Sequence, residues 1–284
     1  MTYVLSKMAQ EAGVRLLLHT YISDAIVEDG VLKGIIVENK SGRSAILSQV
    51  TVDASGDGDV AARAGVPFEV GRRIDGEGIS MKLMYRLGGL PSDRFHPQWG
   101  HIHGPQAPGL SGIDADDLTA AEIKVREAVM RQVEEHRKKD PDVYLLETGV
   151  QIGVRETRRM QGEYTLTTDD VLEGNRFDDV IAIGANPVAA HGIRRPHLMH
   201  EGFDIPYRCL VPKDVDNLLL SGRSISMSHL ALGSVRAMAT VMAIGQALGT
   251  AAALCSQDDV TPRNFDVSQL QRALIEQRAE LRLD

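Results

Sequence analysis

Two junctions, each a short apolar strand that ends at a glycine, limit what this chain can fold into. The first covers residues 52–57 (VDASGD) and the second covers residues 218–223 (LLLSGR). Small residues then recur from Gly233 to Ala253 and predict a long helix that packs closely on a sheet. The free amides and the positive dipole end of such a helix suit an anion or an electron-rich ring.

Composition describes an ordinary globular protein. The chain has 284 residues, of which 43% are hydrophobic and 25% charged, enough for one large domain or two modest ones. Its formal net charge of −8 argues against nucleic acid as the main partner, because binding to phosphates needs a basic face. The two cysteines, Cys209 and Cys255, form no C-x-x-C pair, which argues against an iron–sulfur cluster held by this chain. We expect reduced thiols in a cytoplasmic protein.

No segment predicts a membrane span or a signal peptide. The residues at the N-terminus lack a basic region followed by an apolar run. The closest candidate for a span, residues 237–254, carries Gln246 and consists mostly of alanine and glycine. We therefore expect a helix packed inside the protein and no membrane contact.

The first part of the chain predicts a helix, a strand and a three-stranded meander. Apolar spacing favours a helix over residues 4–12, and residues 14–18 are typical of a buried strand. Asp29-Gly30 predicts a tight hairpin between strands at residues 21–28 and 31–38, since both turn positions need positive φ. A third strand is expected at residues 45–52, directly before the first junction.

The rest of the chain predicts a mixture of helices and strands. Strict alternation indicates a half-buried strand over residues 79–87, and residues 88–112 indicate a long irregular loop. Helices are expected at residues 57–65, 119–139, near 168–170, from about 234 and at 267–283; further strands are expected at residues 150–155, 163–167 and 180–184. In the helix at residues 119–139 the side chains expected to point inward are Ile123, Ala128, Val129 and Val133.

The first junction also matches a dinucleotide-binding pattern. Residues 56–61 (GDGDVA) fit G-x-G-x-x-A after a strand, so an NAD-dependent dehydrogenase is one alternative. The preceding strand closes a meander instead of opening a βαβ unit, and no clean strand with an acidic end follows. A plain strand-to-helix turn is therefore the other interpretation of this motif.

Both junctions and the motifs between them resemble one family. With residues 153–159 (GVRETRR), 162–166 (GEYTL), 205–208 (IPYR) and 210–212 (LVP), the chain resembles FAD-dependent oxidoreductases of the glutathione-reductase-type fold. It is similar in particular to the flavin domain of heterodisulfide-reductase-like proteins, and the resemblance covers nearly the whole chain. The resemblance implies an α/β fold: an FAD/NAD(P)-binding-type domain, N-terminally truncated, with a β-meander and an inserted mixed α+β cap or substrate region.

The resemblance also implies a division of the chain and a set of cofactor contacts. Residues 1–70 and 205–284 are expected to form the FAD-binding domain, with residues 71–204 as the cap or substrate region. The residues expected to bind FAD are Gly56, Asp57, Gly222, Arg223, Gly233 and Ser234. The glycines would let the backbone approach the cofactor, and the Arg223 guanidinium would bind phosphate or the flavin edge. Gly233 and Ser234 would cap the long helix and present amides to the flavin ring.

The sequence also offers a few candidates for acid–base chemistry and for substrate binding. His191 is the candidate acid or base, because the family has a histidine after the strand at residues 180–184; a structural histidine is the alternative. Arg155, Arg158 and Arg159 are candidates to clamp a substrate carboxylate, with surface salt bridges as the alternative for at least one of them. Tyr164 and Tyr207 are possible phenol donors, with ordinary packing as the alternative. His229, close to the helix start, could face the flavin. The histidines at residues 101 and 103 and at 197 and 200 lack acidic or cysteine co-ligands, so we expect no metal site.

The G-x-G-x-x-G unit that opens complete members of this family has no counterpart here. We expect the chain to be a fragment, to have a misassigned start, or to have lost the site. A missing segment or a partner chain would then complete the FAD site, and the chain alone would bind flavin weakly and be poorly soluble. The expected function is flavin-dependent oxidation or reduction of a small organic substrate; the alternative is an inactive remnant that serves as a subunit or interaction module.

Overall fold

The computed structural model describes residues 2–90, 101–190, 193–194 and 202–281. Its helices are α1 Thr2–Glu11, α2 Asp59–Arg63, α3 Ala115–Lys139, α4 Thr168–Glu173, α5 His229–Val235, α6 Met238–Asp258 and α7 Val267–Glu276. The strands up to the middle of the chain are β1 Tyr21–Glu28, β2 Val31–Asn39, β3 Gly42–Leu47, β4 Thr51–Asp53, β5 Phe68–Val70, β6 Met81–Gly88 and β7 His101–Ala107. The later strands are β8 Tyr144–Thr148, β9 Arg158–Met160, β10 Val180–Gly184, β11 Ala189–Ala190, β12 Ile193–Arg194, β13 Phe203–Pro206 and β14 Leu218–Leu220.

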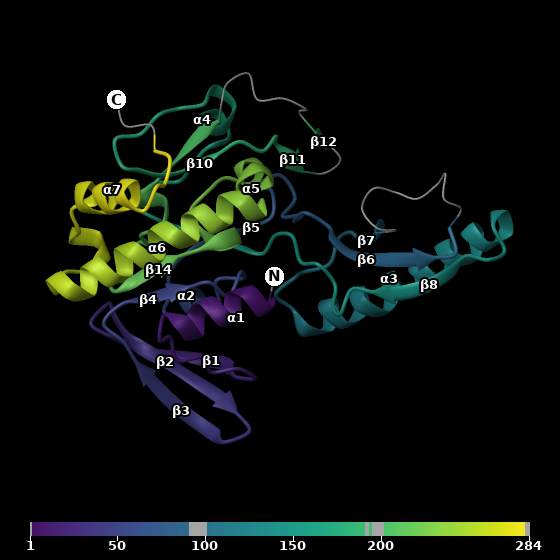
Figure 1. Ribbon diagram of the computed structural model, residues 1–284, viewed down its shortest axis with the longest axis horizontal. Coiled ribbons are helices and arrows are strands. Elements are labelled where there is room, and N and C mark those ends of the chain that lie inside the picture. Colours follow the sequence, from purple (N-terminus) through teal and green to yellow (C-terminus); the bar gives the residue numbers. More distant parts are fainter. Residues whose placement is uncertain (1, 91–100, 191–192, 195–201, 282–284) are drawn as a thin grey trace.

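A parallel pair of strands brings the two predicted junctions together. β4 pairs with β14 in parallel, with Val52 opposite Leu219. Parallel strands end at the same edge, so both glycine turns lie side by side there. β14 is fully buried, and α6 packs its buried side chains, which include Ile244, Ala247 and Leu248, into the same core. Figure 1 shows α6 running over β14 in the larger part of the molecule.

The meander agrees with its turn chemistry. β1, β2 and β3 form an antiparallel sheet, and the turn residues Asp29 and Gly30 have φ of 51° and 76°. The single strand expected at residues 45–52 is two strands, because β3 ends at Leu47 and the chain turns before β4 begins at Thr51. Figure 1 shows the meander projecting from the end of the molecule below β4.

A second, smaller core forms around β6. This strand lies between β7 and β8, and its residues alternate between buried and half-buried, as its sequence pattern predicts. α3 covers the sheet with Ala121, Val125, Val129 and Val133. The expected inward face was right for Val129 and Val133 and wrong for Ile123, which is 57% exposed. Ile123 lies off the row of residues, four apart, that contacts the sheet.

Several element predictions differ from the structure. Residues 14–18 form no strand and are exposed, since no described strand pairs with them. Strand β7 occupies part of the loop expected at residues 88–112. The expected strands at residues 150–155 and 163–167 are replaced by β8 and β9, which begin earlier in the chain. The long helix begins at Met238, after the separate short helix α5.

The two cores do not follow the expected division of the chain closely. Residues between Met81 and Ile152 form the smaller core, whereas Met160, Leu166 and Ile181 belong to the larger one with β14 and α6. The boundaries near residues 70 and 204 stay a prediction.

Helix α6 is long and apolar enough to cross a membrane by length and composition alone. One such helix is weak evidence, since a core helix passes the same test. The buried residues of α6 pack on the larger core, as expected of such a helix. The absence of membrane contact stays a prediction.

Candidate cofactor and substrate site

A buried carboxylate organises the first junction. Asp53 accepts hydrogen bonds from the Ser55 amide (3.0 Å), the Ser55 hydroxyl (2.7 Å) and the Ala61 amide (2.9 Å). The Ser55 hydroxyl in turn accepts from the amide of Asp59 at 2.9 Å. Gly56 has φ of 84°, a conformation that glycine adopts without strain. Side chains of the junction itself therefore bind the amides at the start of α2.

This arrangement argues against the NAD alternative. A pyrophosphate site needs free amides at a helix start and a glycine that the ligand can approach. The start of α2 is already bonded to Asp53 and Ser55, and a Cβ at Gly58 would lie 2.3 Å from the Met160 Cε. Gly58 thus packs against the protein, and the motif is the strand-to-helix turn that the sequence left open as its other interpretation.

Two of the predicted cofactor residues contact each other. The Arg223 guanidinium binds the Asp57 carboxylate at 2.6 Å, and Thr157 donates to the same carboxylate at 2.8 Å. Arg158 donates to the Asp57 carbonyl and pairs with Asp59 at 3.1 Å. Arg158 therefore holds the first junction in place, and it remains a prediction that it clamps a substrate.

Beside both junctions lies a cavity of about 440 Å³, which we call the arginine cavity. Its lining residues are Leu5, Ala54, Gly56, Val154, Arg155, Ser221, Gly222, Arg223, Arg236, Met238, Val241 and Met242. The predicted residues Gly56, Gly222 and Arg223 are thus brought together with Arg155. Gly222 has φ of 67°, and a Cβ built there would meet open space, so the backbone is accessible from the cavity.

The arginine cavity carries positive charge that its surroundings leave largely unbalanced. Within the described residues Arg155 and Arg236 have no ion pair, and the Nε atoms of Arg223 and Arg236 are buried without a partner. Burial lowers the pKa of Arg236, and the charges of Arg155 and Arg223 lower it further. Burial also lowers the pKa of Arg155. An anion in this cavity would relieve both effects.

The predicted capping role of Gly233 and Ser234 was wrong. Both residues are buried within α5, and the Ser234 hydroxyl has no hydrogen-bond partner among the described residues. The long helix starts at Met238 after Ala237, which provides no side-chain cap, and Met238 lines the arginine cavity. The free amides at the start of α6 therefore belong to residues from Met238 onward, which the sequence had predicted to lie inside the helix.

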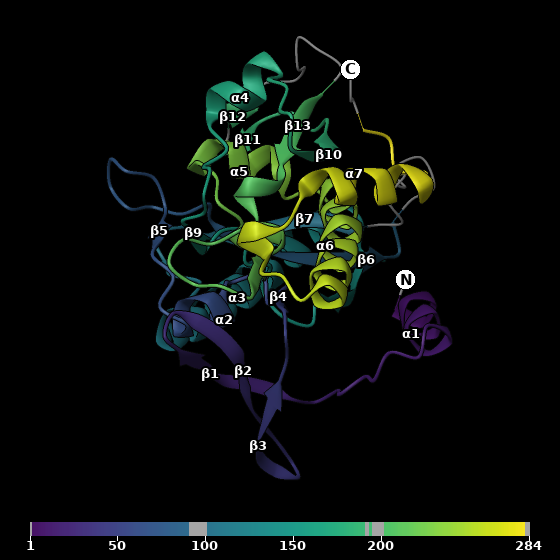
Figure 2. The same cartoon turned by 90° about the vertical axis from the view of Figure 1, so that its left-hand side faces the viewer.

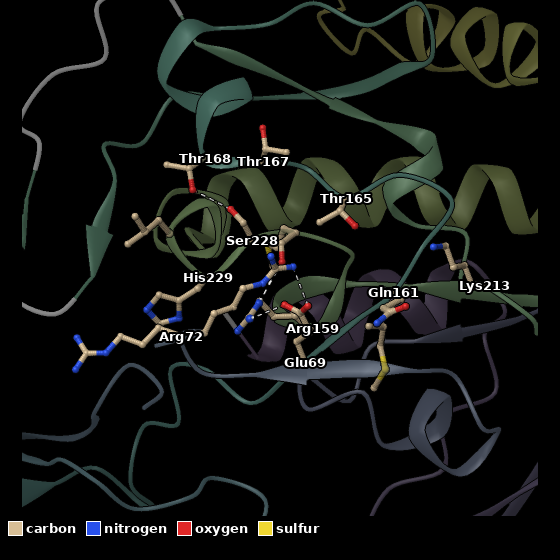
Figure 3. Close-up of a pocket in the computed structure, with 14 residues that line it drawn as sticks. Glu69, Arg72, Arg159, Gln161, Thr165, Thr167, Thr168, Lys213, Ser228 and His229 are labelled. Atoms are coloured by element: carbon tan, nitrogen blue, oxygen red, sulfur yellow. Dashed lines mark hydrogen bonds and ion pairs between the residues drawn. The ribbon is translucent and has the colours of Figure 1, made fainter. Parts of the chain in front are cut away.

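A second cavity, of about 670 Å³, lies around His229, and we call it the histidine cavity. Its lining residues are Glu69, Arg72, Arg73, Arg159, Met160, Gln161, Thr165, Thr167, Thr168, Lys213, Met227, Ser228, His229 and Leu230 (Figure 3). The His229 Nδ1 lies 2.8 Å from Glu156 Oε1, which also binds Arg159. Glu156 Oε2 accepts from the Ile79 amide at 2.8 Å.

Glu156 was not among the residues predicted from the sequence. Arg159 was predicted as a carboxylate clamp, and its guanidinium is paired with Glu156. Glu156 and His229 are separated by 73 positions, so no local spacing links them. The only available signal was the alternation of charges in the motif at residues 153–159. In the structure Arg155 lines the arginine cavity, whereas the next residue, Glu156, binds His229 of the histidine cavity.

The other acid–base candidates are placed as follows. His191 lies outside the described residues, so its role stays a prediction. The Tyr164 hydroxyl donates to Asp170 at 2.8 Å, and burial together with this bond raises the pKa of Tyr164 to about 12. The Tyr207 hydroxyl donates to the Pro262 carbonyl. Both phenols therefore have structural partners.

The comparisons with known proteins point to one family. A family model described as FAD dependent oxidoreductase matches residues 1–108 and 100–274, which is most of the chain. A search of curated proteins found no match.

Solved structures give distant similarities. The flavin-dependent brominase Bmp2 is 13% identical (TM-score 0.46), with coverage of 96% of this chain and 57% of that one. A geranylgeranyl bacteriochlorophyll reductase-like protein from Thermoplasma acidophilum is 12% identical (TM-score 0.46; 98% and 58% coverage). L-proline dehydrogenase from P. horikoshii is 13% identical (TM-score 0.39; 99% and 60% coverage). The chain thus spans less than two thirds of the length of each of these proteins.

Proposed function

Because this chain belongs to the FAD-dependent oxidoreductase family, we propose that it provides part of the FAD site and the substrate site of an enzyme acting on a small organic molecule. FAD supplies the two-electron chemistry of such enzymes, while the protein binds the cofactor, orients the substrate and adjusts local charge. The cytoplasmic location and the role of His191 belong to the same proposal.

The observation that carries this proposal is the charge of the arginine cavity. The guanidinium groups of Arg155, Arg223 and Arg236 converge beside both glycine junctions, and only Arg223 has a carboxylate partner among the described residues. Such a cluster is unfavourable in an empty site and favourable around an anionic group. The phosphates of FAD and its anionic reduced ring are both groups of this kind. The residues present therefore fit the cofactor of the family.

We propose further that a strand–glycine loop–helix unit, on the same chain or on a partner chain, covers this site. Alternation along β4 directs the backbone groups of Val52 away from β14, to an edge that no described strand occupies. Met238 and Met242 are exposed on α6, and added Cβ atoms at Gly245 and Gly249 would meet open space. A free strand edge beside an apolar helix face is the surface that such a unit would bury.

The test is flavin binding by the purified chain. Wild-type protein and the variants Arg155→Met and Arg236→Met are titrated with FAD, and the bound flavin is measured by visible absorbance after desalting. Arg131→Met is the matched control, because Arg131 is an exposed α3 arginine with one i,i+4 partner, Glu127. We expect weak binding by the wild type and the control, and a loss of about tenfold or more in affinity in each cavity variant.

Two results would contradict parts of this proposal. Equal FAD affinity in all four proteins would show that the arginine cavity is not the cofactor site. A longer protein or a complex that contains the added unit should bind FAD tightly. If that protein also fails to bind FAD, the chain is the inactive remnant that the sequence left as an alternative.

A further inference from the structure

We infer that the histidine cavity takes a small substrate with a carboxylate group, and that His229 is its catalytic acid–base residue. Glu156 is the positioning residue for His229. This inference rests on the proposed function, because the flavin has to accept or supply the electrons. It concerns a different cavity from the one proposed to hold FAD.

Both carboxylate oxygens of Glu156 are bound by neighbouring groups of the protein. Its side chain is completely buried, and its two oxygens receive the Ile79 amide, the Arg159 guanidinium and His229 Nδ1. Arg159 is also buried, so its guanidinium holds Glu156 in place by an ion pair that solvent does not screen. A carboxylate at Nδ1 keeps the proton of the imidazole on that nitrogen, so Nε2 is the nitrogen that exchanges a proton with a substrate.

The lining of the histidine cavity favours an anionic ligand. Four cationic side chains line it, against one carboxylate, that of Glu69. Arg72 and Arg73 are paired with Asp75 and Glu69, respectively. Lys213 has no ion pair within the described part of the chain and is exposed at the cavity. It is the cation available to a ligand.

Hydroxyl groups complete the recognition surface. Thr165, Thr167, Thr168 and Ser228 lie along one side of the cavity, opposite Glu69 and Arg159, with His229 and Lys213 at its two ends (Figure 3). The Thr168 and Ser228 hydroxyls are 2.9 Å apart, which orients them toward each other. Hydroxyls and one lysine recognise a carboxylate by hydrogen bonds and charge.

The histidine cavity also lies against the proposed cofactor site. Consecutive residues Arg155 and Glu156 serve the two cavities, and the charge of Glu156 acts on Arg236, where it raises the pKa. The two cavities are therefore neighbours along this segment. A substrate that lies between His229 and the flavin would exchange electrons on one side and a proton on the other.

The proton step balances as follows. If FAD is bound as proposed, it would supply the two-electron oxidation by taking a hydride from a substrate C–H bond, and a second hydrogen would leave the substrate as a proton. His229 Nε2 accepts that proton, and the resulting imidazolium lies against the Glu156 carboxylate. In the direction of reduction His229 returns the proton.

Chemical modification tests the site without a known substrate. The purified chain is treated with diethyl pyrocarbonate, with and without succinate as the carboxylate probe, and modified histidines are mapped by peptide mass spectrometry. We expect succinate to slow modification of His229 at least threefold and to leave exposed His19 unaffected. Lys213→Met should abolish the protection but keep the rate measured without succinate.

Glu156→Gln tests the positioning role. The amide keeps the size of the side chain but removes the carboxylate that binds His229 Nδ1, so we expect the rate of His229 modification at neutral pH to change at least threefold while exposed His19 keeps its rate. A role of Glu156 in packing alone would leave both rates unchanged. If the variant does not fold, the succinate and Lys213→Met measurements still decide whether the site exists.

The contrary outcomes are distinct from those of the flavin test. An unreactive His229 in folded protein, no protection by succinate, or protection that survives in Lys213→Met would each overturn this inference. Arg236→Met should lose FAD binding and keep the succinate protection. If Arg236→Met loses FAD binding but the wild type shows no succinate protection, the cofactor proposal stays intact and the substrate proposal is removed.

Discussion

Arg236 carries a charge that the described part of the protein does not neutralise. Its Nε is buried without a partner, and burial together with Arg155 and Arg223 lowers its pKa. A buried guanidinium in this situation reduces the stability of the unliganded protein and increases its affinity for an anion. Single residues of this kind show where function was favoured over stability.

The Arg236→Met variant measures how much the unpaired Arg236 charge lowers the stability of the unliganded protein. Without ligand we expect the free energy of unfolding to rise by about 1 kcal/mol, because a desolvated charge is replaced by an apolar chain of similar length. The measurement is urea denaturation of wild type and variant, with Arg131→Met as the surface control. A variant that is less stable than the wild type would show that Arg236 has a structural partner.

The elements depend on local hydrogen bonds that side chains supply. In α4 the Thr167 hydroxyl caps the helix, and Asp170 receives the Thr167 amide and hydroxyl and the Tyr164 hydroxyl. Asn175 donates to the other Asp170 oxygen at 2.8 Å. This capping box fixes where α4 begins and joins it to the loop before β10.

The capping box predicts a pH effect on stability. Burial raises the pKa of Asp170, but its hydrogen bonds to Asn175, Thr167 and Tyr164 together outweigh burial, so the net pKa is lowered. A lowered carboxyl pKa adds stability above the unfolded value of about 3.9, and this stability is lost as the pH falls through the folded value.

Asp170→Asn should therefore lower stability at neutral pH and flatten the acid limb of the stability curve. Denaturant unfolding between neutral and acidic pH measures both effects. The matched control is Asp169→Asn, an exposed position in the same first turn, which should keep the wild-type slope. Equal slopes in wild type and Asp170→Asn would exclude the capping box as the source.

The turn between β4 and α2 makes a second prediction at the scale of elements. Gly58 has φ of 65°, and an added Cβ would lie 2.3 Å from the Met160 Cε. Gly58→Ala should cost about 1–3 kcal/mol of unfolding free energy through strain and overpacking. Gly13→Ala, with φ of 71° and open space around it, is the control for strain alone. Equal costs would mean that the Met160 contact is unimportant.

As a whole, the molecule is a larger core and a smaller core, with apolar side chains left exposed on α1, on the segment after it and on α6. In Figure 2 α1 stands apart from the larger body and is joined to the meander by an extended segment. Tyr3 and Met8 of α1, Leu18 of that segment and Met242 of α6 are each more than half exposed. Surfaces of this kind mark sites of association or, in an unpartnered chain, of aggregation.

These exposed apolar side chains predict that the chain alone associates with itself. Sedimentation velocity should show larger species as concentration rises, and the double variant Leu18→Lys with Met242→Lys should shift the distribution toward monomer. Ile123→Lys, on the exposed face of α3, is the control and should behave as the wild type. A wild-type chain that stays monomeric over the whole range would contradict the prediction.

Local rules of the sequence were enough for much of the fold. Asp29-Gly30 predicted the hairpin, alternation predicted β6, and the apolar stripe through Leu270 and Leu274 predicted α7. The family resemblance predicted FAD as the cofactor and named Gly56, Gly222 and Arg223 as contacts, which line one cavity in the structure. These features follow from turn chemistry, periodicity and the shared edge of a parallel strand pair, all of which act over short stretches of chain.

The tertiary structure decided what depends on distant partners. Residues 14–18 have the composition of a buried strand but remain exposed, because a strand needs a neighbour and the described residues offer none. The pairing of Glu156 with His229 links residues 73 positions apart, and no local period encodes such a contact. The face that α3 buries, the start of α6 at Met238 and the charge left around Arg155 were set in the same way, by which surfaces meet when the elements pack.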